Sequence, residues 1–137
     1  QDARLTIKEI SREVNLSSTP VYERIKRMER EGFIRRYVTI LDAEKIHKGF
    51  IVFCSVKLSP LNKQVAKEFC DTIKEIAEVT ECYNISGRFD YLLKVHAPDM
   101  KYYQSFVLNV LGQLPMLGSL ESTFVMEEIK NDFGVAI

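Results

Sequence analysis

The chain has 137 residues, of which 46% are hydrophobic and 28% charged, a balance typical of folded globular domains and not of disordered chains. No apolar run reaches the roughly 18–20 residues of a membrane-spanning helix, and the sequence starts without the basic and apolar regions of a signal peptide. Basic and acidic residues balance at 19 each, but residues 1–49 carry 11 and 8, whereas residues 50–137 carry 8 and 11. This opposite charge predicts two domains with separate roles.

The three cysteines are well separated and form no Cys-x-x-Cys pair. An odd number of separated cysteines argues against a disulfide framework and against a zinc site. We therefore expect Cys54, Cys70 and Cys82 to be buried free thiols in a protein of the reducing cytoplasm.

The first predicted helix begins after Thr6. Ile7, Ile10 and Val14 recur at the spacing of one helical face. Glu9 stands at the third helical position, where it can complete a capping box with Thr6.

A second helix is predicted to end at Gly32, which suits a helix C-terminus. Pro20 suits the first turn of this helix. Val21, Ile25 and Met28 are spaced as a buried apolar stripe.

Two short helices with three or four residues between them match the spacing of a helix-turn-helix. Cations lie opposite the apolar stripe of the second helix, and residues 33–41 form a β-rich segment with basic side chains near its start. Such a basic strand is expected to act as a wing that contacts the DNA backbone or minor groove. The residues predicted to contact DNA are Ser17, Ser18, Thr19, Tyr22, Glu23, Lys26, Arg27, Arg30, Arg35 and Arg36. The simpler alternative is an ordinary helix face exposed to solvent.

A complete helix-turn-helix contains a third helix, usually the first in the chain, which covers the apolar side chains of the other two. No residue precedes Gln1 in this sequence, so we expect that first helix to be missing from the chain. The DNA-binding part is assigned to residues 1–41, and a polar linker to residues 42–49.

From Phe50 onward apolar residues alternate, which predicts the first strand of a second domain. The predicted elements are strands at 50–58, 79–86, 91–97 and 120–129, and helices at 62–77 and 98–114. The order β-α-β-β-α-β predicts an α+β, ferredoxin-like domain whose two helices cover one face of the sheet.

The second face of this sheet is predicted to be too apolar for solvent. It is assigned Ile51, Phe53, Asn84, Thr123 and Val125. Exposed apolar patches of this kind mark interaction surfaces, so we expect the face to pack against another subunit.

No set of catalytic or metal-binding residues stands out in the sequence. His47 and His96 are isolated, and no phosphate-binding loop or Gly-x-Ser-x-Gly motif occurs. Glu127 and Glu128 are neighbours on a predicted strand, so their side chains point to opposite faces and cannot form an acid/base pair. We therefore expect no catalytic residue, no metal and no cofactor, and hence no enzyme.

Several segments carry a joint signature: VNLSSTPVYERI at 14–25, MEREGFI at 28–34, Glu-Cys at 81–82, SGRFDYLL at 86–93, PDM at 98–100 and VMEE at 125–128. Together they resemble the Lrp/AsnC family of leucine-responsive and asparagine-responsive transcription regulators, also called feast/famine proteins. The resemblance covers essentially the whole chain.

The resemblance implies a prokaryotic, cytoplasmic, DNA-binding transcription regulator. It implies a winged helix-turn-helix at 1–41, a linker at 42–49 and, at 50–137, the effector-binding domain that the family calls RAM. Such domains dimerise through their sheets and assemble further, typically into octamers of four dimers. The implied partners are double-stranded DNA, an amino-acid effector and further copies of the chain, without a membrane.

In this family amino acids bind between dimers, near the loop joining the two central strands, which here is the turn at 86–90. Gly87 allows close approach of the backbone, and free N–H groups of the turn can receive a carboxylate. Asp90 is expected to bind the α-ammonium group, and Arg88 a carboxylate or a polar side chain. The residues assigned to the effector are Asn84, Ser86, Gly87, Arg88, Phe89, Asp90, Tyr91, Thr123, Phe124 and Val125. The alternative is a plain hairpin turn whose Asp90 caps its own backbone.

Close leucine-responsive members carry an acidic residue where Arg88 stands and an aliphatic one where Asn84 stands, which argues for an effector other than leucine. Two alternatives compete with the regulator: a stand-alone amino-acid-sensing or interaction module without DNA contact, and a small ferredoxin-like enzyme subunit. The basic helix and the Arg35–Arg36 pair favour the regulator over the module. The missing catalytic set counts against the enzyme.

Overall fold

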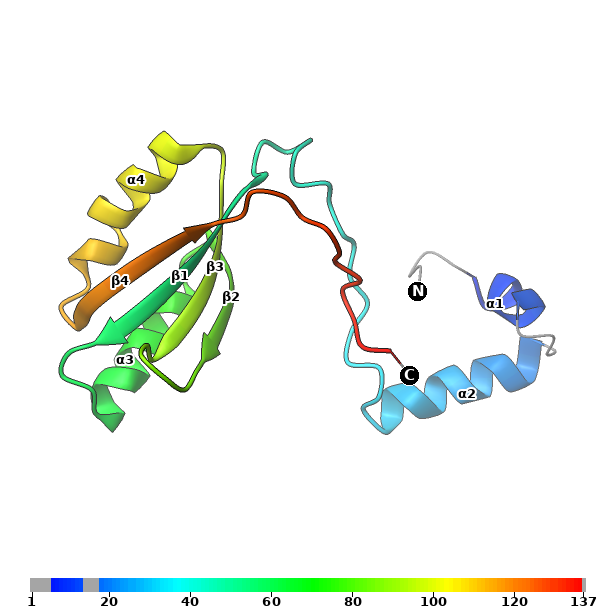
Figure 1. Ribbon diagram of the computed structural model, residues 1–137. Helices are drawn as coiled ribbons and strands as arrows, with labels where there is room; N and C mark the ends of the chain where they lie inside the picture. The colour runs from blue at the N-terminus through cyan, green and yellow to red at the C-terminus, as the bar shows by residue number, and fades with distance from the viewer. Residues whose placement is uncertain (1–5, 14–17, 137) are drawn as a thin grey trace. The chain divides into compact units, whose positions relative to one another are not determined.

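The computed structural model describes residues 6–13 and 18–136. The chain forms two compact units, residues 1–41 and residues 42–137 (Figure 1). The first unit contains helices α1 (Ile7–Glu13) and α2 (Ser18–Arg30). Among the described residues, no helix is long and apolar enough to cross a membrane.

The predicted capping signals of the first unit are confirmed. The Thr6 N–H donates to Glu9 Oε2 at 2.6 Å, and the Glu9 N–H donates to Thr6 Oγ1 at 3.2 Å, which is the reciprocal pair of a capping box. Gly32 follows the end of α2 with a φ of 79°, a conformation that glycine adopts without strain. The predicted contributions of Val14 and Ser17 lie outside the described residues.

The apolar stripe of α2 is buried at its start and exposed near its end. Val21 is 4% exposed and Ile25 is half-buried, but Met28 is 39% exposed, so its predicted burial is wrong. The reason is length: α1 has 7 residues and α2 has 13, so α1 covers only the first turns of α2 (Figure 1).

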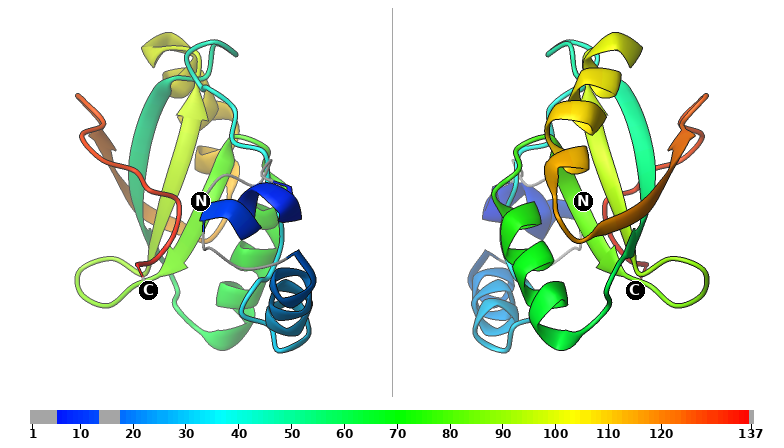
Figure 2. Two further views of the ribbon diagram at one scale, coloured as in Figure 1. Left: turned by 90° about the vertical axis from the view of Figure 1, so that its right-hand side faces the viewer. Right: turned by 90° about the vertical axis from the view of Figure 1, so that its left-hand side faces the viewer.

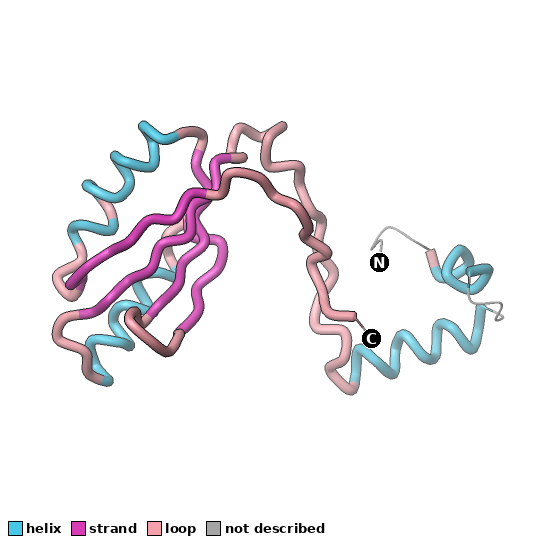
Figure 3. Tube along the Cα trace, in the orientation of Figure 1, coloured by secondary structure: helices cyan, strands magenta, loops and turns pink. Residues whose placement is uncertain are grey.

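Residues 33–41 were predicted to form a basic strand, and that prediction is wrong. The segment is irregular (Figure 3). Most of its residues are exposed. A strand requires a neighbouring strand to receive its backbone hydrogen bonds. In the described part of residues 1–41 no other strand is present to pair with it.

The second unit is a ferredoxin-like domain, as predicted. Its elements are β1 (Phe50–Leu58), α3 (Lys63–Lys74), β2 (Val79–Asn84), β3 (Tyr91–Ala97), α4 (Met100–Asn109), the 3₁₀ turn η1 (Leu111–Gln113) and β4 (Leu117–Phe124). The sheet is antiparallel with the strand order β2-β3-β1-β4. Both α3 and α4 lie on one face of this sheet (Figure 2).

The core lies between that face and the helices. Alternate residues of β1, namely Val52, Cys54 and Val56, are fully buried. Phe69 of α3 is also fully buried, and its ring centroid lies 4.8 Å from that of Tyr91. Directly paired residues share a face of the sheet, so this burial also determines which side chains lie on the open face.

The open face carries Ile51, Phe53 and Thr123, as predicted, because Phe53 pairs with Thr123 and alternates with the buried residues of β1. The assignment of Asn84 to this face is wrong, since Asn84 pairs with the buried Tyr91. A register shift between Val79 and Glu81 reverses the alternation of β2. Glu81 and Tyr83 take the open face instead, opposite Lys94 and Leu92.

The last strand begins and ends earlier than the predicted 120–129. It spans Leu117–Phe124, and the Val125 N–H still donates to the Ile51 carbonyl at 3.0 Å. Beyond that point β4 runs past the start of β1 at Phe50, so it has no partner. Glu127 and Glu128 therefore follow the strand and do not lie on it.

The cysteines are free thiols, but their burial differs. Cys54 is buried, and this burial raises the pKa of its thiol. Cys70 is half-buried, and Cys82 is exposed because β2 is an edge strand, so the expectation of three buried thiols is wrong for Cys82.

Candidate functional site

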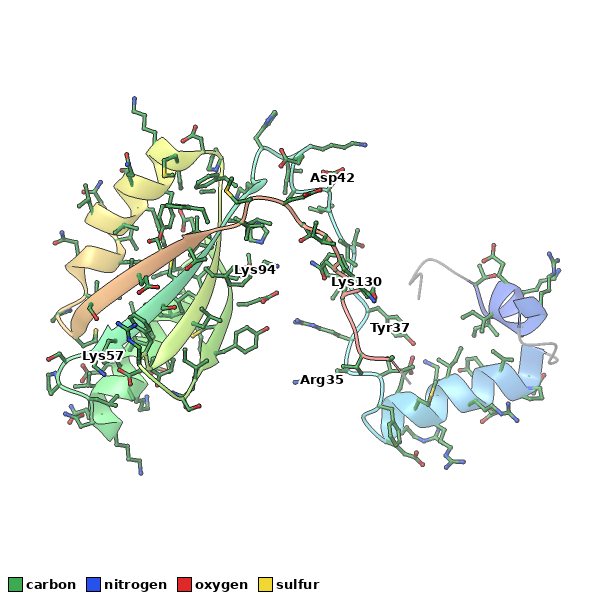
Figure 4. The ribbon with its side chains drawn as sticks, in the orientation of Figure 1. Arg35, Tyr37, Asp42, Lys57, Lys94 and Lys130 are labelled. Atoms are coloured by element: carbon green, nitrogen blue, oxygen red, sulfur yellow. The ribbon has the colours of Figure 1, made fainter. Side chains whose placement is uncertain are left out.

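The outward face of α2 carries most of the residues predicted to contact DNA. Thr19, Tyr22, Glu23, Arg27 and Arg30 are exposed, and Lys26 is half-buried. Ser18 is the first residue of α2, whereas Ser17 lies outside the described residues. Arg35 and Arg36 are exposed on the irregular segment that follows. Figure 4 labels Arg35.

Two of the predicted phosphate-binding cations are paired with acids one helical turn later. Lys26 Nζ lies 2.9 Å from Glu29 Oε2, and Arg27 Nε lies 2.9 Å from Glu31 Oε1. Pairs at this spacing on an exposed helix are weak and screened by salt. A DNA phosphate can therefore replace either carboxylate.

Glu29 joins the helix to the segment that follows it. The Tyr37 hydroxyl donates to Glu29 Oε1 at 2.8 Å. The other partner of Glu29, Lys26, also lies 5.7 Å from the centre of the Tyr22 ring. The hydrogen bonds from Lys26 and Tyr37 lower the pKa of the Glu29 carboxyl. The i,i+3 spacing of Lys26 and Glu29 could have revealed this pair in the sequence, but nothing local indicates Tyr37.

Four arginines on or beside α2 make no ion pair within the described part of the chain. They are Arg24, Arg30, Arg35 and Arg36. Arg24 was not among the predicted contacts, although it is exposed. These arginines offer cations to phosphate without first losing an acidic partner.

The turn between β2 and β3 is held against the end of β1 by Asp90. Asp90 Oδ2 accepts a hydrogen bond from the Leu58 N–H at 2.8 Å, and the Asp90 N–H donates to the Val56 carbonyl at 2.9 Å. The Asp90 carbonyl accepts from the Ile85 N–H at 2.9 Å and from Asn84 Nδ2 at 3.0 Å. The Asp90 carboxylate thus caps the backbone of another strand, not that of its own turn.

The tip of the turn is exposed and rich in unused donors. Ser86, Gly87 and Arg88 are exposed, and Gly87 has a φ of 108°. The backbone N–H groups of residues 86–89 donate no hydrogen bond within the described chain. Lys57, which sequence analysis missed, reaches the turn: its Nζ donates to the Arg88 carbonyl at 3.5 Å (Figure 4).

The structure does not bring all predicted effector residues together within one chain. Tyr91 is 6% exposed, and its ring packs on Phe69 in the core. A hydrogen bond with Cys70 is the main cause that raises the pKa of Tyr91 to about 12, and burial is the second cause. Phe124 pairs with Val52 on the helix side of the sheet. The turn contacts β1 at Val56–Leu58, whereas Thr123, Phe124 and Val125 adjoin β1 at residues 51–53.

The turn and the end of β4 contact β1 at positions that are far apart along the strand. From Val56 to Ile51 is five residues, or about 16 Å at the rise of a strand. Asn84, Ser86, Gly87, Arg88, Phe89 and Asp90 form one group, and Thr123, Phe124 and Val125 form another.

A shallow hollow of about 500 Å³ lies on the open face of the sheet. Ile51, Phe53, Glu81 and Lys94 line it, together with residues 125 and 127–131 after β4. Lys94 has a side chain only 13% exposed, and its Nζ lies 3.6 Å from Glu81 Oε1. Among the described residues, no cluster of three or more His, Cys, Asp or Glu side chains could hold a metal ion.

Comparison with known proteins identifies the two units. The family model described as the Lrp/AsnC ligand binding domain matches residues 51–135, and the model described as winged helix-turn-helix DNA-binding matches residues 1–35. The chain belongs to the Lrp/AsnC family. It is a transcription regulator with a DNA-binding helix-turn-helix and a ligand-binding domain, and its relatives are regulators and not enzymes.

Individual relatives agree with this assignment. The chain is 36% identical over 130 residues to the leucine-responsive regulatory proteins of Escherichia coli K12 and Klebsiella pneumoniae, covering 95% of this chain and 79% of each relative. A Neisseria meningitidis transcriptional regulator, solved as an L-Met complex, is 32% identical with a TM-score of 0.92, covering 97% of this chain and 86% of that one. An AsnC family regulator from Agrobacterium tumefaciens is 34% identical with a TM-score of 0.91, covering 98% and 88%.

The geometry of Asp90 predicts a cost in stability when its carboxylate is removed. We expect Asp90→Ala to lower the free energy of unfolding by about 1–3 kcal/mol, because the part-buried Leu58 N–H loses its acceptor. Urea denaturation measures this change. Arg88→Ala, at an exposed position of the same turn, is the control and should change it by less than about 0.5 kcal/mol. Equal stability of Asp90→Ala and wild type would show that the carboxylate does not hold the turn.

Proposed function

We propose that this regulator binds operator DNA through α2 and the basic segment after it, and that an amino acid bound at the turn at 86–90 controls that binding. The observation that carries the DNA part is the exposed basic face of a helix-turn-helix helix. The observation that carries the effector part is the exposed turn with free backbone donors in a domain matched by the Lrp/AsnC ligand-binding model. The L-Met complex of the Neisseria meningitidis relative supports an amino acid as the class of effector. A regulator of chromosomal DNA in a prokaryote would act in the cytoplasm.

The proposed DNA contacts divide by position on α2. Thr19 and Tyr22 lie near its N-terminus, where recognition helices present side chains to base edges. Glu23 follows on the same helix, and the proposal keeps Ser17 and Ser18 as contacts from the sequence alone. Lys26 and Arg27 lie on its exposed face and are assigned to phosphates. Arg30, Arg35 and Arg36 extend that phosphate-binding set, and the structure supports adding Arg24.

Self-association through the open face of the sheet completes the proposal. Ile51, Phe53 and Val125 are half-buried there, and Lys94 is nearly buried beside them, although α3 and α4 both lie on the opposite face of the sheet. A second copy would remove this apolar surface from water. We propose a dimer formed in this way, and assembly of four such dimers into an octamer.

Arg27→Ala tests the phosphate contacts. We expect it to weaken specific and non-specific DNA binding together and to flatten the slope of log K against log salt by about 0.9, because one phosphate contact is lost. Fluorescence anisotropy with operator and random duplexes at several salt concentrations measures both. Lys101→Ala, on α4 of the other unit, is the control and should leave the slope unchanged. An unaltered slope for Arg27→Ala would identify an ordinary solvated helix face.

The effector is tested by adding each of the twenty amino acids to the protein–DNA complex. At least one should shift the DNA affinity by about 5–150-fold, the usual range of coupling between two sites. Asp90→Asn keeps an oxygen acceptor for the Leu58 N–H but removes the charge that would hold an α-ammonium group. This variant should bind DNA normally and lose the response. A response of wild-type size in Asp90→Asn would remove Asp90 from the effector site.

Phe53→Glu tests the proposed dimer face. We expect it to shift the protein toward monomer in sedimentation velocity at micromolar concentration, because a charge would be buried against the second copy. Leu108→Glu places the same charge on α4, where the leucine is 69% exposed, and should leave the assembly intact. A wild-type sedimentation profile for Phe53→Glu would place the contact between copies elsewhere.

A further inference from the structure

Two cations, Arg88 of the turn at 86–90 and Lys57 of β1, lie at this turn, which holds one carboxylate, that of Asp90. Lys57 Nζ is drawn to the turn by its hydrogen bond to the Arg88 carbonyl, and the Arg88 side chain belongs to the turn itself. Neither cation makes an ion pair within the described part of the chain. Two unpaired cations at one exposed turn favour the binding of an anionic group there.

The acids near these cations are occupied or remote. Asp90 directs Oδ2 to the Leu58 N–H, which leaves Oδ1 as its unused oxygen in the described structure. Glu121 stands on the open face opposite Ser55, two residues along β1 from Lys57, and makes no ion pair with Lys57 in the described chain. Neither Lys57 nor Arg88 is therefore held by a carboxylate of the described domain.

The same turn offers a second place for a carboxylate. The N–H groups of residues 86–89 have no acceptor within the described chain, and Gly87 lets a ligand approach the backbone closely. The Arg88 guanidinium lies 5.9 Å from the centre of the Phe89 ring, so the aromatic ring of this turn already has a cation beside it.

We propose that the effector is a dicarboxylic amino acid, aspartate or glutamate. Its α-carboxylate binds the N–H groups of residues 86–89, and its α-ammonium group binds Asp90 Oδ1. Its side-chain carboxylate binds Arg88 and Lys57. This inference rests on the proposed effector site and adds the chemical class of the effector to it.

An amino acid with a neutral side chain is expected to bind this turn more weakly than one with a side-chain carboxylate. Glutamine matches glutamate in shape but leaves both cations without an opposite charge, and a hydrogen bond between charged groups is stronger than one between neutral groups. We therefore expect discrimination between the acid and its amide, which differ in a single functional group.

The test is isothermal titration calorimetry on the full chain with L-glutamate, L-aspartate, L-glutamine and L-asparagine. The better acid should bind at least about 10-fold tighter than its amide. Arg88→Gln and Lys57→Gln should each remove most of that preference, and Arg88→Lys should keep part of it. Lys63→Gln, at the start of α3, is the control and should keep all of it. Glutarate, which lacks the ammonium group, should bind more weakly than glutamate.

The outcomes separate this inference from the proposed function. If leucine or methionine binds and shifts DNA affinity while glutamate and aspartate do not, the dicarboxylate is wrong and the amino-acid effector stands. Equal binding of acid and amide, or a preference unchanged in Arg88→Gln and Lys57→Gln, also overturns it. If glutarate binds as tightly as glutamate, the ammonium group contributes nothing, and the effector is a simple dicarboxylate and not an amino acid. If no amino acid binds, both the inference and the effector site fail.

Discussion

Burial of alternate residues of β1 beneath α3 and α4 is the constraint on which the ligand-binding domain depends. β1 is hydrogen-bonded to β3 on one side and β4 on the other, and Val52, Cys54 and Val56 are fully buried. A slip of one residue would move this apolar set to the open face, so burial determines the register of both neighbours. That register in turn places the turn at 86–90 at one end of β1 and the end of β4 at the other.

At the turn, the residue that holds the structure is also the one proposed to bind the effector. One oxygen of Asp90 holds the turn on β1, and the other is free within the described chain. A site that is held in place before the ligand arrives loses less conformational entropy on binding. This arrangement also means that a simple loss of Asp90 would mix two effects, which is why an isosteric amide separates them better than alanine does.

The two proposed binding surfaces differ in whether their cations are paired with acids. Glu29 on α2 and Glu31 just after it compensate Lys26 and Arg27, so part of the positive charge of this face is balanced within the described chain. Such compensation weakens non-specific attraction to DNA, which depends on net cationic charge. At the turn, Lys57 and Arg88 are left without acids in the described chain. The net charge of zero over the whole chain conceals this difference.

The sequence by itself determined the features that depend on neighbouring residues. The bounds of β1 and β3 match the predicted strands 50–58 and 91–97, and the capping box at Thr6 and the glycine after α2 match as well. These follow from side-chain periodicity and local hydrogen bonding, which need no distant partner. The joint motifs likewise indicated the family that comparison then established.

Features that depend on pairing were decided by the tertiary structure. The register shift in β2 moved Asn84 off the open face, and the start of β1 at Phe50 ended β4 early. Residues 33–41 have strand-like composition but no strand beside them in the described part of their unit. Asp90 Oδ2 accepts a hydrogen bond from the Leu58 N–H, 32 residues away in the chain. Thr123 lies at the opposite end of β1 from the turn. Periodicity describes which face a residue prefers, whereas register and long-range hydrogen bonds are known only once the partner strand is in place.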